Sequence, residues 1–159
     1  MTHHQLKYLL WSVVVGVTLS LTACMEWDYG DAVEDFNATG SGLFITNEGN
    51  FQYGNASLSY YDPETKQVQN EIFFRANGMK LGDVAQSMTI RDNKGWVVVN
   101  NSHVIFAIDL NTFKEVGRIE NLTSPRYIHF LRDEKASVTQ LRDNRNIIIN
   151  TRTYEFTGH

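Results

Sequence analysis

The sequence predicts an all-β fold made of repeated antiparallel sheets, and three observations support this. From residue 43 onward, short runs of apolar and β-branched residues alternate with turn residues, and no segment has a helical period. These runs repeat at an offset of 41 residues, which carries Ile90 onto Leu131. The same four-residue turn, Asp or Asn followed three positions later by Thr, begins at Asp62, Asp109 and Asn150.

The chemistry of this repeated turn favours a junction between two strands. An Asp or Asn at the first position accepts hydrogen bonds from backbone N–H groups two or three residues further on, and Pro63 presets φ at the second position of the first copy. Strands that repeat every 40 to 45 residues are typical of the blades of a β-propeller. We therefore predict a β-propeller domain over residues 41–159.

The predicted strands fall into about three four-stranded blades, of which the first has only three strands. The first blade holds Leu43–Asn47, Ser57–Tyr61 and Gln67–Phe74. The second holds Gln86–Arg91, Trp96–Asn100, Val104–Asp109 and Glu115–Ile119. The third holds Tyr127–Arg132, Ser137–Leu141, Asn146–Asn150 and Tyr154–Gly158.

The blade count predicts an incomplete ring. A propeller closes with about four to eight blades, and the innermost strand of the first blade often comes from the other end of the chain. We expect the sequence to be the N-terminal part of a longer protein. A complete three-blade protein, or an assembly of several copies, is the alternative.

The N-terminal segment has the features of a bacterial lipoprotein signal peptide over residues 1–23. An apolar stretch, Tyr8–Leu21, follows a polar start and is shorter than the roughly 20 residues of a membrane span. Thr22 and Ala23 then precede Cys24, the single cysteine of the chain. We predict lipidation at Cys24, with a membrane anchor or a core helix as the alternative.

Residues 24–40 are acidic and lack periodicity, so we predict an extended tether between the membrane and the domain. An acidic segment after the lipidated cysteine resembles the surface-export signal of Bacteroidetes lipoproteins. The predicted location is the outer membrane at the cell surface, with the periplasmic face as the alternative.

Charge and motif content argue against nucleic-acid binding and catalysis. The net charge is −4 and no basic patch occurs, which disfavours nucleic acid. His103, His129 and His159 lack the paired spacing of a zinc site, and His129 on an inner strand is expected to be a core residue. No nucleophile elbow, dinucleotide fingerprint or phosphate loop occurs. We expect no enzyme, no cofactor and no metal.

Taken together, the signal, the tether, the blade turns and the segments Gly42–Asn50 (GLFITNEGN) and Gly82–Met88 (GDVAQSM) resemble a known family. They are similar to the YncE-like, surface-layer-type β-propeller lipoproteins of gut Bacteroidetes, including the surface cobalamin-binding propellers of vitamin B12 uptake. This resemblance implies a seven-bladed ring. It also implies non-enzymatic capture of a corrinoid at the cell surface and its transfer to a TonB-dependent outer-membrane transporter.

Strand parity predicts which loops share a face. Because strands within a blade run back and forth, the loops between the second and third strands lie on the same side as the connections between blades. Variable loops on a rigid scaffold usually carry recognition. These loops are Asn47–Ala56, Arg75–Ala85, Asn100–His103, Glu120–Arg126 and Arg142–Arg145.

Two kinds of side chain in these loops suit a flat, amide-rich ligand. The aromatic rings offer large contact area, and asparagines offer paired donors and acceptors. The alternatives are that the aromatics pack on the first blade, the asparagines cap turns, and Asp83 caps a turn instead of facing the channel. The candidate ligand-binding residues are Asn47, Asn50, Phe51, Tyr53, Asn100, Asn101 and His103.

Two classes of function follow from the sequence. The first is a surface protein that captures a small ligand, with a corrinoid favoured. The second is a surface scaffold or adhesion propeller that binds a protein or a glycan. An aromatic cleft would favour the first class, and a flat charged face would favour the second.

Overall fold

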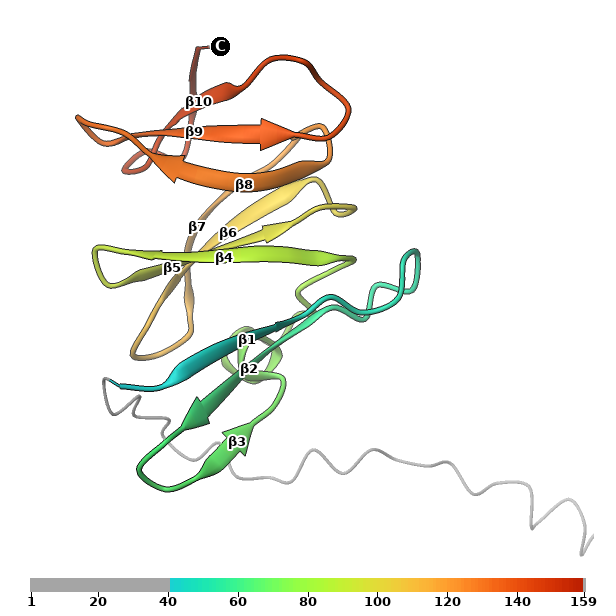
Figure 1. Ribbon diagram of the computed structural model, residues 1–159, viewed down its shortest axis with the longest axis vertical. Coiled ribbons are helices and arrows are strands. Elements are labelled where there is room, and N and C mark those ends of the chain that lie inside the picture. Colours follow the sequence, from blue (N-terminus) through green and yellow to red (C-terminus); the bar gives the residue numbers. More distant parts are fainter. Residues whose placement is uncertain (1–40, 159) are drawn as a thin grey trace, which may run out of the picture. The chain divides into compact units, whose positions relative to one another are not determined.

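A computed structural model describes residues 41–158, which form eleven strands and one short helix in three antiparallel sheets (Figure 1). The first sheet holds β1 (Leu43–Asn47), β2 (Ser57–Asp62) and β3 (Gln67–Gln69), and the helix α2 (Ile72–Asn77) follows it. The second sheet holds β4 (Ala85–Arg91), β5 (Lys94–Val99), β6 (Val104–Asp109) and β7 (Glu115–Ile119). The third holds β8 (Pro125–Phe130), β9 (Lys135–Gln140), β10 (Ile147–Asn150) and β11 (Phe156–Gly158). The predicted signal peptide, Cys24 and the tether lie outside the described residues.

The three sheets follow one another along the chain and contact their neighbours through the strands that begin them. Strands pair in sequence order within each sheet, so β4 bonds to β5 and β8 bonds to β9. Between sheets, β1 contacts β4, while β4 and β5 both contact β8. The sequence prediction of an all-β, propeller-like arrangement is confirmed, including the three strands of the first sheet.

The repeated turn forms as its sequence predicts. Oδ1 of Asp109 accepts hydrogen bonds from the N–H groups of Asn111 and Thr112, both at 2.9 Å. Oδ1 of Asn150 accepts from the equivalent N–H groups, and Oδ1 of Asp62 does the same in the first sheet. Partial desolvation acts to raise the pKa of Asp109, but the hydrogen bonds from Thr112 and Asn111 outweigh it and lower that pKa.

The residue after each turn adopts a left-handed conformation, and in two sheets it is an aromatic that packs onto the preceding sheet. Phe113 (φ 55°) lies against the first sheet, with its ring 5.6 Å from Phe44 and 5.8 Å from Tyr60. Tyr154 (φ 61°) lies against the second sheet, 5.7 Å from Trp96. The 41-residue repeat therefore encodes the packing between sheets as well as the turn.

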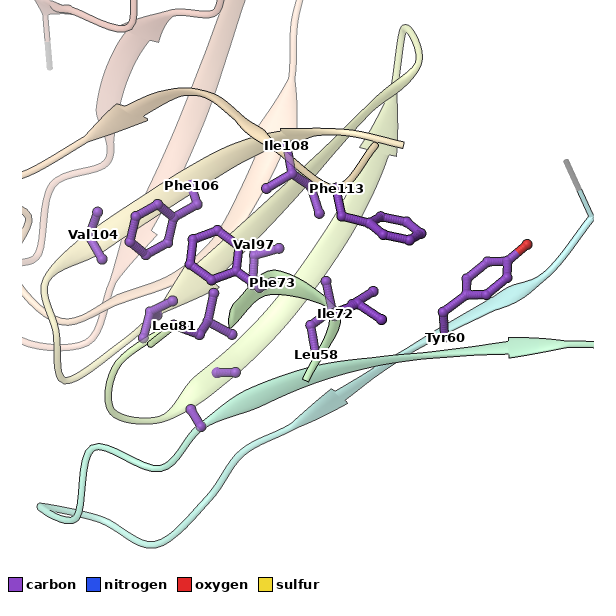
Figure 2. Packing of buried hydrophobic residues seen from close by; sticks show 13 residues of the cluster. Leu58, Tyr60, Ile72, Phe73, Leu81, Val97, Val104, Phe106, Ile108 and Phe113 are labelled. Carbon is purple, nitrogen blue, oxygen red and sulfur yellow. The ribbon is translucent and has the colours of Figure 1, made fainter. Parts of the chain in front are cut away.

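The second sheet is covered on both faces, which explains the nearly continuous burial of its central strands β5 and β6. One face packs on the first sheet and α2, as Figure 2 shows for Val97, Phe106 and Ile108 beside Leu58 and Phe73. The opposite face packs on the third sheet through a second cluster. That cluster is formed by Trp96, Val98, Ile105, Ala107, Ile119, Leu122, Ile128, Ala136, Val138, Ile147 and Ile149.

The predicted strand Gln67–Phe74 is wrong in its second half, because β3 ends at Gln69 and α2 begins at Ile72. Ile72 and Phe73 are both buried in the core between the first two sheets, at 3% and 1% exposure. Successive residues of a strand point to opposite faces, whereas one turn of helix buries both on the same side. Gly78 (φ 68°) ends the helix as its left-handed cap.

Candidate functional site

Three of the loops that were predicted to share a face are joined by hydrogen bonds. We call residues 48–56, 78–84 and 100–103 the loop cluster. The N–H of Ala56 donates to the carbonyl of Gly82 at 3.0 Å, and the N–H of Gln52 donates to Oδ2 of Asp83 at 2.8 Å. The Asp83 N–H in turn bonds the hydroxyl oxygen of Ser102 at 2.8 Å. The first and second sheets therefore present one continuous set of loops.

Gly82 allows these loops to approach one another closely. Its φ of 123° is one that side chains rarely adopt, and a Cβ at this position would lie 2.4 Å from Oγ of Ser102. The adjoining bonds of Ala56 and Asp83 both depend on this close approach. Glycine here is required by the packing of the loop cluster.

The two predicted aromatic residues stand out from the loop between β1 and β2. Phe51 is 56% exposed and Tyr53 is 76% exposed, so more than half of each residue faces solvent. The loop has internal support, because the N–H of Asn50 donates to Oδ1 of Asn55 and the N–H of Tyr53 donates to the carbonyl of Asn50. Both rings are therefore presented to solvent by a loop with a defined shape.

Three of the predicted asparagines, Asn47, Asn100 and Asn101, make structural hydrogen bonds through their side chains. Nδ2 of Asn47 donates to the hydroxyls of Ser57 and Ser59 in β2, and Nδ2 of Asn100 donates to the carbonyl of Pro125 at 2.8 Å. Asn100 is only 8% exposed, and its bond links the second sheet to the third. These contacts favour the alternative weighed from the sequence, in which asparagines shape the turns.

His103 is placed beside the loop cluster by a left-handed backbone (φ 59°). Its Nδ1 accepts a hydrogen bond from the N–H of Ser124 at 3.3 Å, and its carbonyl accepts from Leu122. The imidazole is exposed and borders an open depression of about 510 Å³. The depression is lined by Lys80, Leu81, Gly82, Ser102, His103, Val104, Phe106, Arg118, Glu120 and Asn121.

Arg118 forms the charged wall of this depression. Its guanidinium bonds both carboxylate oxygens of Glu115 at 2.6 Å and lies 5.1 Å from the centre of the Phe106 ring. The hydrogen bond to Glu115 raises the pKa of Arg118, so its charge persists at every ordinary pH. Because Glu115 and Glu120 both pair with this arginine, Lys80 is the lining cation that no described acid neutralises.

The opposite end of the sheets carries the short turns and a second depression of about 400 Å³. It lies between the second and third sheets and is lined by side chains of both charges, including Arg91, Asp92, Asp133 and Lys135. Within the described residues, no group of His, Cys, Asp and Glu could hold a metal ion. No helix between residues 41 and 158 has the length and apolar character needed to cross a membrane.

The expectation that His129 is a core residue is wrong. Along β8 the side chains alternate, and His129 points with Tyr127 to the exposed face of the third sheet, while Ile128 faces the second sheet. A strand whose second face is uncovered within the described chain leaves every other residue in solvent. The position of His129 on a strand was predicted correctly, but not which face of that strand is covered.

Sequence reasoning missed the residues that connect the loops. Asp83 was considered as a turn cap, yet its carboxylate bonds the backbone of a loop 31 positions away and the side chain of Asn101. No local sequence pattern predicts that the Asp83 carboxylate accepts a hydrogen bond from the backbone N–H of Gln52. Lys80 and Arg118 also escaped notice, because they reach the depression from segments that are distant in sequence.

Three sequential antiparallel sheets that contact through their first strands define a propeller-like, all-β class of protein. Residues 41–159 match the family described as Domain of unknown function (DUF5074), and the chain belongs to that family. Among solved structures, apo AztD from Citrobacter koseri is similar, with a TM-score of 0.45 and 14% identity. That similarity covers 67% of this chain and 29% of AztD. No curated protein sequence matches the chain.

Proposed function

We propose that this protein is a non-enzymatic, lipid-anchored binding protein that captures a small ligand with the loop cluster. The supporting observation is the pair of exposed aromatics, Phe51 and Tyr53, on a loop that is hydrogen-bonded to Asp83, the residue next to Gly82 in the lining of the open depression. The depression, at about 510 Å³, falls within the range of roughly 300–1,000 Å³ of small-molecule sites. Exposed aromatic faces suit a flat organic ligand.

A corrinoid is the ligand that we propose to test first, with transfer to a TonB-dependent outer-membrane transporter as the biological step. The proposal rests on the resemblance of the lipoprotein signal, Gly42–Asn50 and Gly82–Met88 to YncE-like and cobalamin-binding surface propellers. A ring with seven blades would supply contacts in addition to those of the three sheets.

The ligand test compares the two ends of the sheets. Phe51→Ala and Tyr53→Ala should each weaken binding of cyanocobalamin several-fold, because an aromatic contact contributes about 0.5–1.5 kcal/mol beyond its buried area. The matched control is Thr112→Ala, which removes a turn hydroxyl at the opposite end. Titration calorimetry would measure both sets. Equal losses at both ends, or no heat with cyanocobalamin, would contradict the proposal.

A surface scaffold that binds a protein or a glycan is the second candidate. It is favoured by the shape of the depression, which is open, and by the charged side chains of Lys80, Arg118 and Glu120 in its lining. An open, charged face suits a macromolecular partner more than an enclosed small ligand. Absence of corrinoid binding together with capture of a defined glycan would favour this candidate.

The proposed location depends on lipidation of Cys24, which follows Leu21-Thr22-Ala23. Cys24→Ala should abolish incorporation of a fatty-acid analogue and leave the signal peptide uncleaved, since the thiol carries the acyl group. Metabolic labelling followed by electrophoresis would measure both effects. Cys24→Ser is a control of similar size that also lacks the thiol and should behave alike. Unchanged labelling in either variant would show that the anchor lies elsewhere.

A further inference from the structure

Asp83 is a buried carboxylate that joins the first two sheets at the loop cluster. It is 8% exposed, and its Oδ2 accepts hydrogen bonds from the N–H of Gln52 at 2.8 Å and from Nδ2 of Asn101 at 2.6 Å. Its Oδ1 is buried and makes no hydrogen bond within the described chain. Burying a carboxylate oxygen without a hydrogen-bond partner costs free energy. A carboxylate at this position is therefore not explained by core packing alone, which points to a specific role for the two bonds of Oδ2.

The third sheet shows that the turn itself does not need this carboxylate. Val84 (φ 64°) accepts a hydrogen bond from the N–H of Asn100 at 2.8 Å where the chain enters the second sheet. Ser124 (φ 50°) accepts one from Leu141 at 2.9 Å where the chain enters the third. The residue before Ser124 is Thr123, so the same backbone turn forms with threonine in the place of Asp83.

What distinguishes the second sheet is the loop that Asp83 contacts. Gln52 lies between Phe51 and Tyr53 and has a left-handed backbone (φ 70°). The loop's other bonds are internal or lie at its base, where Ala56 meets Gly82. Within the described residues, the Asp83 bond is the hydrogen bond that holds the tip of this loop to the second sheet.

We infer that Asp83 is the positioning residue of the aromatic loop, residues 48–56. Its carboxylate holds the backbone of Gln52 and thereby sets the positions of Phe51 and Tyr53 for ligand capture. The part of this inference that concerns affinity rests on the proposed function. The part that concerns the loop does not. Asn101, bonded to the same oxygen, orients the carboxylate toward Gln52.

The loop part is tested by hydrogen exchange and proteolysis on the full chain carrying Asp83→Ala. The Gln52 N–H and Nδ2 of Asn101 bond the same carboxylate oxygen, so alanine removes both hydrogen bonds, whereas the single carbonyl oxygen of asparagine would keep them. We expect exchange of the Gln52 amide to rise at least tenfold, and chymotrypsin to cleave after Phe51 and Tyr53 correspondingly faster. Exchange in β5 and β6 should stay at the wild-type rate.

Two further variants make the outcome decisive. Asp109→Ala makes the same chemical change at the opposite end, where the carboxylate accepts from Asn111 and Thr112, and should leave Gln52 exchange unchanged. Asp83→Thr copies Thr123 and serves if Asp83→Ala fails to fold. Unchanged Gln52 exchange in a folded Asp83 variant would overturn the inference. So would faster exchange throughout the second sheet, which would identify Asp83 as a general stability residue.

The affinity part is tested with cyanocobalamin. Asp83→Ala should weaken binding by the same factor as Phe51→Ala, and the double variant should be no weaker than either single variant. A loss of affinity without faster Gln52 exchange would overturn the inference. If the wild-type protein gives no heat with cyanocobalamin, the proposed corrinoid function fails, while exchange and proteolysis still decide the role of Asp83.

Discussion

Trp96→Ala should lower the free energy of unfolding by about 3–5 kcal/mol, the range for deleting a large buried aromatic. Trp96 is 2% exposed and lies between the second and third sheets, with Phe130 at 5.6 Å and Tyr154 at 5.7 Å between ring centres. Its removal leaves a cavity that two aromatic neighbours from the next sheet cannot fill without moving.

Equilibrium unfolding in urea, followed by circular dichroism, measures this loss. The control is Phe51→Ala, which truncates an exposed ring and should change stability by no more than about 0.5 kcal/mol. A loss below about 1 kcal/mol for Trp96→Ala would mean that the second and third sheets do not pack as described.

Gly117→Ala should destabilise the protein by about 1–3 kcal/mol, as overpacking in a well-packed region does. A Cβ on Gly117 would lie 2.3 Å from the ring of Tyr154. That ring cannot move freely, since Tyr154 also packs on Trp96 and its hydroxyl bonds Nζ of Lys94 at 3.0 Å.

The repeat supplies the control for this prediction. Gly158 stands 41 positions after Gly117, and a Cβ there would meet nothing within 4 Å. Thermal melts of the two variants measure the difference, and Gly158→Ala should be nearly neutral in them. Adding Tyr154→Ala to Gly117→Ala should also remove most of the overpacking cost. Equal destabilisation at both glycines would show that the effect comes from the backbone and not from the ring.

The strands and turns were predictable because their signals are local. Alternating apolar runs and the hydrogen bonds that Asp62, Asp109 and Asn150 offer to their own turns depend on neighbours in sequence. The helix α2 was missed because the apolar run at Ile72 and Phe73 is too short for its period to separate helix from strand. The packing of Ile72 and Phe73 between the first and second sheets decides that this segment is helical.

The candidate site was predictable in outline and not in detail. Strand parity placed Phe51, Tyr53 and His103 in loops at one end of the sheets, and their exposure agrees with that placement. Strand parity does not predict the hydrogen-bond partner of each asparagine side chain. Asn100 was therefore predicted to bind ligand, although its Nδ2 donates to the Pro125 carbonyl. No sequence pattern predicts the hydrogen bond that the Asp83 carboxylate accepts from the backbone N–H of Gln52, in the loop of another sheet.

The most direct test of the proposed binding face is a hydrogen-exchange footprint of cyanocobalamin on the full chain. We expect slower exchange in residues 48–56, 78–84 and 100–103 when the ligand is present, and no change in the turns at residues 63–66, 92–93 and 110–114 at the opposite end. Protection confined to those turns, or spread evenly over both ends, would contradict the assignment of ligand capture to the loop cluster.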